Sequence, residues 1–334
     1  MQKRILIVRT DRVGDVVMIT PVIRELRNKF PDSFIGALTN VNSSDILTGN
    51  PYLDVCITDD LKKESFGKVV KVIRELNFTD GLLMMPTERA AYQMFLGGIK
   101  NRIGVGSKLY EVITFMKSVS RNRYIPLRHE ADYCMDLARR LGVETGDLNP
   151  EIFLSAEEIS EGGEMLLRCG MKSDREKITV HTGSGNSSRN WSEGKYLDLI
   201  KKITEMKPDS VIILTAREMS NWFRGEILKL NPENIISADR EINRLRDLIK
   251  IIANTDLLIA SSTGPLHLAS ALKIKTIGLF CHRPMNCARH WGALGDKAVN
   301  LEVSKEKCDL NCSSDKEICE FENGIEIEDV LMEI

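Results

Sequence analysis

The chain has 334 residues, 43% of them hydrophobic and 28% charged, and its formal net charge is −2. This length predicts two domains that can each bury a core, and the balanced charge argues against a general nucleic-acid binder. No apolar run approaches the roughly 18 residues of a membrane-spanning helix, and the first residues lack a signal-peptide core, so we expect a cytoplasmic protein.

Apolar strand-like runs alternate with helical patterns along the chain. Strands are expected at 5–8, 34–38, 81–85, 178–180, 211–214, 257–260 and 276–280. Helical patterns run through Leu26 and over 69–76, 196–206 and 242–253. A turn-rich segment at 141–150 separates the halves. The alternation predicts an α/β protein with two doubly wound domains, 1–155 and 156–334, whose strand ends border a cleft.

The first motif, Arg9-Thr10-Asp11-Arg12-Val13-Gly14-Asp15, directly follows the first strand. Gly14 permits a tight turn or a close approach of ligand to backbone. Asp15 comes at the start of the next helix, where it is either an N-cap or a carboxylate placed to take a proton. Downstream, Thr20-Pro21 predicts either a helix that restarts or a kink.

A basic stretch follows in the same half, with Glu111 as its one acid. Seven basic residues lie between Gly97 and the end of this stretch: Lys100, Arg102, Lys108, Lys117, Arg121, Arg123 and Arg128. The stretch is either a solvated helix face or a surface for an anionic acceptor or anionic lipid headgroups.

The second motif, His181 to Trp191, is a loop of small residues after the first strand of the second half. Gly183 and Gly185 begin a Gly-x-Gly pattern, but Ser188 stands where a dinucleotide fingerprint needs its third glycine. The hydroxyls of Thr182 and Ser184, with Arg189 close behind, suit phosphate oxygens. The alternative is a solvated loop in which Trp191 is a packing anchor.

The third motif, Ser261-Ser262-Thr263-Gly264-Pro265-Leu266-His267, joins an apolar strand to an apolar helical pattern. Free backbone N–H groups at such a helix start bind phosphates, because the helix N-terminus carries partial positive charge. Thr263 and Gly264 would donate through the backbone. His267 falls in the first turn, where it is either a further donor or a core histidine.

The late cysteines follow the spacing Cys308-x3-Cys312-x6-Cys319, with Cys281 and Cys287 upstream. No Cys-x2-Cys pair is present, so the pattern favours ordinary thiols over a zinc site. We expect neither a metal ion nor a cofactor.

The three motifs, in this order, resemble those of glycosyltransferase family 9, which includes the lipopolysaccharide ADP-heptosyltransferases. Residues 5–17 resemble its N-terminal signature, which 20–26 continue, and residues 262–269 resemble its C-domain signature. Phe280 followed by Trp291-Gly292 also suits the family. The family has aspartate where this chain has Ser262.

The resemblance implies a GT-B fold, with the acceptor on the N-terminal domain, the sugar nucleotide on the C-terminal domain and a cleft between them. It implies inverting, metal-independent transfer of a heptose from ADP-heptose to a lipopolysaccharide inner core or similar anionic glycolipid. Peripheral contact with the cytoplasmic face of the inner membrane is a further expectation, and nucleic acid is not a partner.

By the same resemblance, Asp15 matches the general base. The residues expected on the donor phosphates are Thr182, Ser184, Arg189, Ser262, Thr263, Gly264 and His267. Glu218 and Asn243 are expected at the nucleoside. The residues expected at the acceptor are Gly14, Lys100, Arg102, Arg121 and Arg123.

Three alternatives stay open at this point. A nicotinamide-dependent oxidoreductase would need a complete Gly-x-Gly-x-x-Gly after the first strand, where this chain has only Gly14. A non-catalytic protein that binds nucleotide sugars or lipids stays open because of Ser262. A glycosyltransferase that uses another nucleotide sugar is equally compatible with the motifs.

Overall fold

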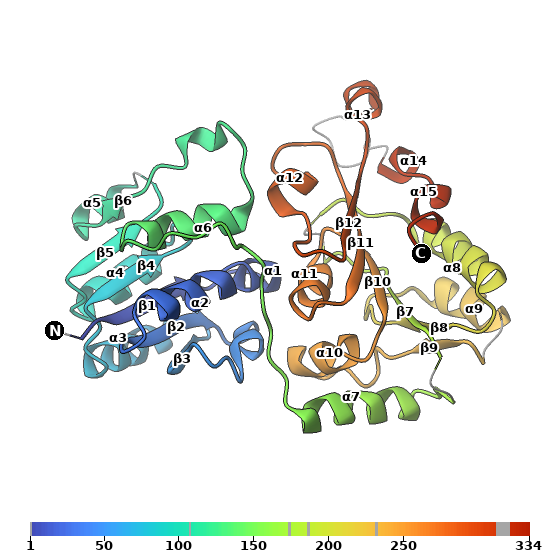
Figure 1. Cartoon of the computed structure of the whole chain (residues 1–334), viewed down its shortest axis with the longest axis horizontal. Helices are drawn as coiled ribbons and strands as arrows, with labels where there is room; N and C mark the ends of the chain where they lie inside the picture. The colour runs from blue at the N-terminus through green and yellow to red at the C-terminus, as the bar shows by residue number, and fades with distance from the viewer. Residues whose placement is uncertain (1, 107, 173–174, 186–187, 231–232, 312–320) are drawn as a thin grey trace. The chain divides into compact units, whose positions relative to one another are not determined.

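The computed structural model describes residues 2–106, 108–172, 175–185, 188–230, 233–311 and 321–334 (Figure 1). The chain divides into two compact units, Met1–Phe153 and Leu154–Ile334, and each contains a parallel sheet with helices around it. Both units are therefore α/β, as the alternation of apolar runs predicted.

The sheet of the first unit has the strand order β3-β2-β1-β4-β5-β6, and its pairings are parallel. Its strands are β1 (Arg4–Arg9), β2 (Phe34–Asn40), β3 (Val55–Asp59), β4 (Asp80–Leu83), β5 (Asn101–Gly104) and β6 (Lys117–Ser118). Its helices are α1 (Val13–Val17), α2 (Thr20–Lys29), α3 (Ser65–Glu75), α4 (Glu88–Leu96), α5 (Leu109–Ile113) and α6 (Glu130–Arg139), with short 3₁₀ turns at Ser44–Leu47 and Asn122–Tyr124.

The second sheet has the order β12-β11-β10-β7-β8-β9 and is also parallel. Its strands are β7 (Lys177–His181), β8 (Val211–Leu214), β9 (Ile235–Ser237), β10 (Leu257–Ser261), β11 (Lys275–Phe280) and β12 (Ala298–Glu302). The helices are α7 (Ala156–Arg168), α8 (Glu193–Met206), α9 (Asn221–Lys229), α10 (Leu245–Ile252), α11 (Gly264–Ala271), α12 (Ala288–Trp291), α13 (Lys305–Asn311), α14 (Phe321–Gly324) and α15 (Ile327–Leu331).

Each sheet has one point at which the chain changes its direction of travel across the strands. In the first unit this point lies between β1 and β4, and in the second it lies between β7 and β10. The loops that leave two such neighbouring strands diverge, and the crevice between them is where open α/β sheets bind ligands. All three sequence motifs follow one of these four strands.

Side chains of the second sheet alternate between two apolar layers. Ile212 and Leu214 of β8 join one core cluster with Ile259 and Ile277, whereas Val211 and Ile213 join another with residues of α7 and α10. Successive side chains of a strand point to opposite faces, so helices must cover both faces of the sheet.

The structure corrects several boundaries. The strands β3, β5, β6, β9 and β12 were not among those predicted, because they are short or weakly apolar. The helix expected at 242–253 begins only at Leu245, since Asp247 accepts the backbone N–H groups of Asn243 and Arg244 at 3.1 Å. The chain restarts at Thr20 as a separate helix with Pro21 in its first turn.

The basic stretch is not one helix face. It passes through β5, α5, β6 and the 3₁₀ turn at Asn122–Tyr124. Among the described residues, no helix has the length and apolar character needed to cross a bilayer.

Gly162 of α7 allows the close packing of α7 on α10. A Cβ atom at this position would lie 2.3 Å from the backbone oxygen of Lys250, whereas one at Gly163 would come no closer than 3.4 Å to a side-chain oxygen of Asn254. We expect Gly162→Ala to destabilise the protein by about 1–3 kcal/mol through overpacking. Gly163→Ala should be neutral or stabilising by up to about 1 kcal/mol, because alanine is the better helix former. Urea denaturation of the two variants checks this, and equal midpoints would contradict it.

Candidate active site

A buried guanidinium organises the crevice of the first unit. Arg9 ends β1 and is only 3% exposed, and three carboxylates surround it. Its Nε donates to Asp11 at 2.8 Å, one Nη donates to Glu130 at 2.7 Å, and the other pairs with Asp15. Asp11 and Asp15 of the sequence motif 9–15 therefore both pair with Arg9, the first residue of the same motif.

Asp15 is the third residue of α1, and the cap position belongs to Arg12. The N-cap alternative for Asp15 was therefore wrong. The Asp15 side chain remains 14% exposed, so its carboxylate is held by Arg9 and still reached by solvent. This is the arrangement that a positioned base requires.

The pKa values of this cluster follow from burial and charge. Burial tends to lower the pKa of Arg9, but the surrounding anions, including Asp11, Asp15 and Glu130, raise it well above its ordinary value. Burial raises the pKa of Asp11 to about 7, with Arg9 opposing the shift and Asp15 adding to it. Arg9 is therefore a fixed cation, and Asp11 carries a proton for part of the time at neutral pH.

Two of the expected acceptor residues have internal partners. Arg121 donates to both oxygens of Glu130, at 2.9 and 3.0 Å, and to the backbone oxygen of Met84. Arg102 is buried and donates to the backbone oxygens of Thr114, at 2.8 Å, and Ile99. These two arginines hold the fold in place.

The other expected acceptor residues differ in exposure. Gly14 is buried within α1, while Lys100 and Arg123 are exposed on separate elements. Gly14 and Arg121 belong to the surroundings of Arg9, whereas Lys100 and Arg102 lie at β5. Arg123 lies in the 3₁₀ turn at Asn122–Tyr124, so the five residues do not form one group in the first unit.

In the second unit, the loop after β7 is tied down by side chains that the motif did not single out. Asn190 donates to the backbone oxygen of Thr182 at 2.6 Å and accepts from the Tyr196 hydroxyl at 2.8 Å. These bonds fix both ends of the loop that carries Thr182, Ser184 and Arg189. Residues 186 and 187 of the loop lie outside the described residues.

His181 ends β7 and shares a 2.9 Å hydrogen bond with the hydroxyl of Thr215, which follows β8. Burial lowers the pKa of His181 to about 4, so its ring is neutral at pH 7. It therefore adds no charge to the crevice and joins the ends of two neighbouring strands.

The helix α11 begins beside that loop, because β10 is the neighbour of β7. Thr263 occupies its cap position without a side-chain cap bond, and the Thr263 hydroxyl is buried with no hydrogen-bond partner in the part of the chain described. A helix start leaves backbone N–H groups without intrahelical partners, and the start of α11 closely follows the carboxyl end of β10. Ser262 precedes the cap and is half-buried.

His267 is buried in the first turn of α11. Its ring centroid lies 6.2 Å from that of Trp291, which in turn stacks on His290 at 5.2 Å. Aromatic packing of this kind fixes the orientation of the imidazole. His267 is thus a packed core ring at a helix N-terminus, and its role as a donor stays a prediction.

The expected nucleoside residues, Glu218 and Asn243, are both exposed on loops. The guanidinium of Arg217 donates to the backbone oxygen of Ile242, so the two loops lie side by side. The structure therefore brings the neighbourhoods of these residues together.

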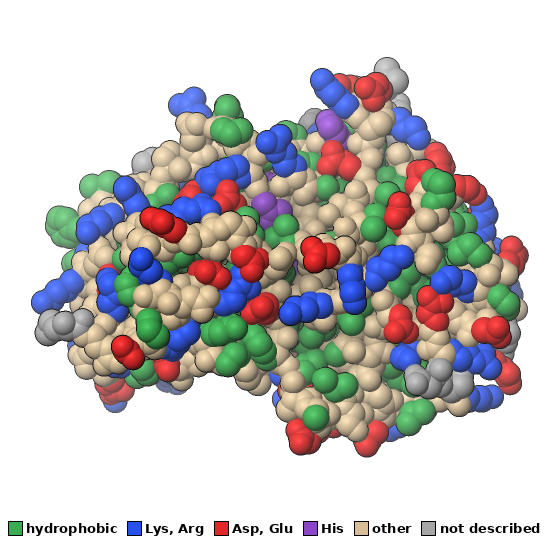
Figure 2. Space-filling view, viewed as in Figure 1, with side chains coloured by type: hydrophobic (Ala, Val, Ile, Leu, Met, Phe, Trp, Pro, Cys, Tyr) green, Lys and Arg blue, Asp and Glu red, His purple; other side chains and the backbone are tan. Residues whose placement is uncertain are grey.

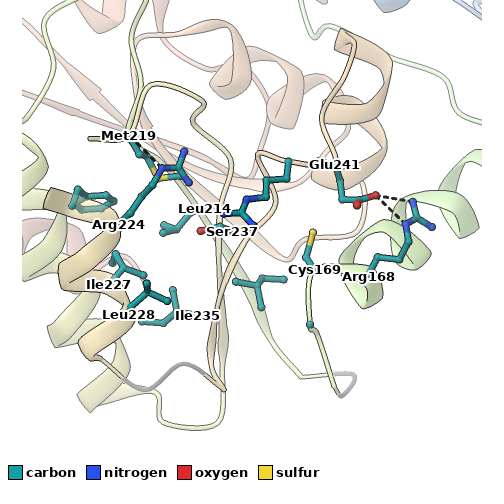
Figure 3. Close-up of a pocket in the computed structure, with 14 residues that line it drawn as sticks. Arg168, Cys169, Leu214, Met219, Arg224, Ile227, Leu228, Ile235, Ser237 and Glu241 are labelled. Atoms are coloured by element: carbon teal, nitrogen blue, oxygen red, sulfur yellow. Dashed lines mark hydrogen bonds and ion pairs between the residues drawn. The ribbon is translucent and has the colours of Figure 1, made fainter. Parts of the chain in front are cut away.

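A cavity of about 390 Å³ opens beside these loops, at the ends of β8 and β9 (Figure 3). Its walls come mainly from α9, the end of α7, β8 and β9. They combine apolar side chains such as Leu214, Phe223 and Ile235 with polar ones such as Arg224 and Arg240. At its edge Arg168 pairs with Glu241 at 2.9 Å (Figure 3). None of the expected phosphate residues lines this cavity.

Cys281, Cys287 and Cys308 are buried. Within the described residues, no three histidine, cysteine or acidic side chains form a metal-binding group. Cys312 and Cys319 lie outside the described residues.

Comparison with known proteins identifies the family. The sequence model of glycosyltransferase family 9 (heptosyltransferase) matches residues 66–319, which is more than half of the chain. The chain belongs to glycosyltransferase family 9. It is therefore a glycosyltransferase, and the family that the motifs predicted is confirmed.

Individual relatives are distant but cover most of the chain. A Haemophilus influenzae protein, named a glycosyltransferase by inference, is 26% identical over 88% of this chain and 87% of its own length. Lipopolysaccharide heptosyltransferase 1 of Campylobacter coli is 22% identical over 84% of each chain. The solved structure of Escherichia coli ADP-heptose lipopolysaccharide heptosyltransferase II has a TM-score of 0.77, at 18% identity, over 100% of this chain and 97% of that one. The last comparison confirms the GT-B fold.

Several residues of this glycosyltransferase's candidate site were missed by sequence reasoning. Arg9 carried a signal, since it is a charge at the end of a wholly apolar run. Glu130 carried none, because it meets Arg9 across 121 positions of the chain. Asn190 and Thr215 are ordinary polar residues in loops, and only the strand order brings them to the crevice.

We expect Arg9→Met to destabilise the protein by about 3–5 kcal/mol, because it leaves several buried carboxylates without their shared cation. Arg12→Met is the matched control, since Arg12 is exposed in the same segment, and it should change stability by less than about 0.5 kcal/mol. Chemical denaturation measures both. Similar midpoints for the two variants would show that Arg9 does not organise the carboxylates.

Proposed function

We propose that this glycosyltransferase transfers a heptose from ADP-heptose, with inversion and without a metal ion, to an anionic glycolipid such as a lipopolysaccharide inner core. The observation that carries the proposal is Asp15, a carboxylate held by buried Arg9 yet reached by solvent. Support comes from the relatives, whose names include lipopolysaccharide heptosyltransferase and ADP-heptose.

In this proposal Asp15 takes the proton from the acceptor hydroxyl. As the hydroxyl oxygen bonds to the anomeric carbon, the bond from that carbon to the diphosphate oxygen breaks, and ADP leaves with the electron pair. A single attack from the face opposite the leaving group inverts the anomeric carbon. The transition state resembles that of glycoside hydrolysis, with positive charge on the sugar ring.

The diphosphate is stabilised by the N-terminus of α11. The backbone N–H groups at Thr263 and Gly264 and the ring of His267 meet the growing negative charge, and Thr182, Ser184 and Arg189 supply further donors from the neighbouring loop. Ser262 adds a hydroxyl in place of the family's aspartate. These donors stabilise the negative charge that a metal ion would otherwise stabilise.

The remaining assignments follow the same division. Residues 1–155 receive the acceptor, with Gly14 close to its reacting group and Lys100 and Arg123 as exposed cations for its phosphates. Residues 156–334 receive the donor, with Glu218 and Asn243 on the nucleoside. Because Arg102 and Arg121 have internal partners, their part in acceptor binding is to hold the surrounding backbone and Glu130 in place.

Another nucleotide sugar is the second candidate for the donor. Ser262 stands where the family has aspartate, so this chain lacks a negative charge next to the phosphate-binding helix. Such a change alters which leaving groups and sugars fit. Acceptor class and base are the same in both candidates.

Asp15→Asn tests the base. We expect it to lower the transfer rate by about 10²- to 10⁴-fold, since the amide cannot accept the proton. Donor binding should stay within about threefold of the wild type. The assay measures sugar transfer with EDTA present, and Asp32→Asn, an exposed carboxylate of the same unit, is the control. Near-normal transfer by Asp15→Asn, or loss of wild-type transfer in EDTA, would remove the base or the metal-independent mechanism, respectively.

A panel of nucleotides tests the donor. ADP, UDP, GDP, dTDP and NAD are compared at matched concentrations by thermal unfolding, and we expect selective stabilisation by ADP. A ligand at 100 times its Kd adds about 2.7 kcal/mol. His267→Ala should weaken this stabilisation. A preference for another diphosphate would favour the second candidate, and a response to NAD alone would contradict the proposal.

A further inference from the structure

A group of large apolar side chains is exposed on the first unit, around α5 and the end of α4. We name this group the α4–α5 apolar surface, and its residues are Phe95, Leu96, Leu109, Val112, Ile113 and Phe115. Leu109 and Phe115 each keep 76% of their surface in solvent, and Val112 keeps 67%. The rings of Phe95 and Phe115 lie 6.5 Å apart, which joins the two helices into one surface. Hydrophobic side chains gather around the α5 end of the molecule, at the left of Figure 2.

The helix α5 has its faces reversed relative to an ordinary surface helix. Leu109, Val112 and Ile113 have the i, i+3, i+4 spacing of a helix face that packs on a core. Here that face is exposed, and the one acid, Glu111, is buried. Single exposed apolar residues need no explanation, but a contiguous exposed group marks a contact site.

Internal bonds hold this reversed helix in place. Glu111 accepts the backbone N–H of Lys108 at 3.1 Å, and the Thr114 hydroxyl donates to the backbone oxygen of Tyr110 at 2.7 Å. Buried Arg102 then donates to the backbone oxygen of Thr114 at 2.8 Å. Phe115 follows with a φ of 52°, a conformation that bulky residues rarely adopt. The exposure of these side chains is therefore built into the fold.

The exposed charges of the segment 97–128 are all positive, while exposed Glu88 at the start of α4 is an acid within electrostatic reach of Tyr110 in α5. Lys108 and Lys117 are exposed on either side of α5, and Lys100 is exposed just before β5. From residue 97 to residue 128 the only acid is Glu111, and it is buried. Apolar side chains bordered by lysines, with no exposed acid in the segment, fit a layer whose interior is apolar and whose surface is anionic.

We propose that the α4–α5 apolar surface docks on an anionic lipid bilayer, with its apolar side chains among the acyl chains and its lysines on the headgroups. This deepens the proposed function and rests on it in one respect, since a glycolipid acceptor gives an enzyme reason to be held at a membrane. The surface also differs from the residues assigned to catalysis, so docking and transfer are separable.

Flotation of the full chain with lipid vesicles tests the proposal. We expect it to bind vesicles of phosphatidylethanolamine with phosphatidylglycerol and to bind phosphatidylcholine vesicles much more weakly. Leu109→Ser combined with Phe115→Ser should reduce partitioning at least about tenfold, because less apolar surface enters the bilayer. Lys108→Gln and Lys117→Gln should each reduce it about fivefold at low salt and have little effect in high salt.

A matched variant controls for exposed apolar surface in general. Leu167→Ser combined with Met332→Ser removes two side chains that are 56% and 77% exposed in the second unit, and its vesicle binding should equal that of the wild type. The proposal is overturned if the wild type does not bind anionic vesicles, or if the double variants behave alike. It is also overturned if the Leu109/Phe115 variant changes only the oligomeric state in size-exclusion chromatography, because a second copy would then cover the surface.

Transfer measured separately distinguishes docking from the proposed function. The Leu109/Phe115 variant should transfer sugar to a deacylated, water-soluble acceptor at the wild-type rate. Asp15→Asn should bind vesicles like the wild type. Vesicle binding by a wild type that transfers no sugar would leave docking intact and remove the proposed function, whereas transfer without vesicle binding would do the reverse.

Discussion

The buried guanidinium of Arg9 is the constraint on which the first unit's crevice depends. A cation without water needs anions around it, and Arg9 takes them from the loop after β1, from α1 and from α6. Arg121 adds a second cation through Glu130, so two positive groups face three carboxylates. A proton on Asp11, whose pKa burial raises to about 7, balances that count. The ion pair with Arg9 also fixes the Asp15 side chain in this crevice.

Both units form their crevices in the same way, but the chemical groups in the two crevices differ. In each unit, the candidate residues follow neighbouring strands between which the strand order changes direction. The order of strands in the sheet therefore brings separate loops together. The first unit fills this crevice with fixed charges. The second offers backbone N–H groups, hydroxyls, the neutral ring of His181 and the guanidinium of Arg189. In the proposed mechanism, the carboxylate that takes the proton and the groups that bind the diphosphate therefore follow strands of separate sheets.

Much of the fold could be predicted from the sequence, because apolar runs such as 5–8 and 257–260 are wholly buried strands. Such runs leave no other interpretation. Motifs directly behind such strands could be placed at the correct sheet edge. Short strands such as β9 could not be seen, since three residues carry too little periodicity. Contacts between distant residues, such as Arg9 with Glu130, depend on the assembled sheet and have no local signal.

The basic stretch shows why a count of charges misleads. Arginines at 102 and 121 look in sequence like the exposed lysines beside them, yet one holds the backbone under α5 and the other holds Glu130. Arginine suits buried positions of this kind because its planar guanidinium donates several hydrogen bonds without losing its charge. What remains exposed is Arg123 and a smaller set of lysines, of which Lys108 and Lys117 lie next to exposed apolar side chains. The same stretch therefore supports the site from within and, through different residues, offers the protein a surface toward lipid.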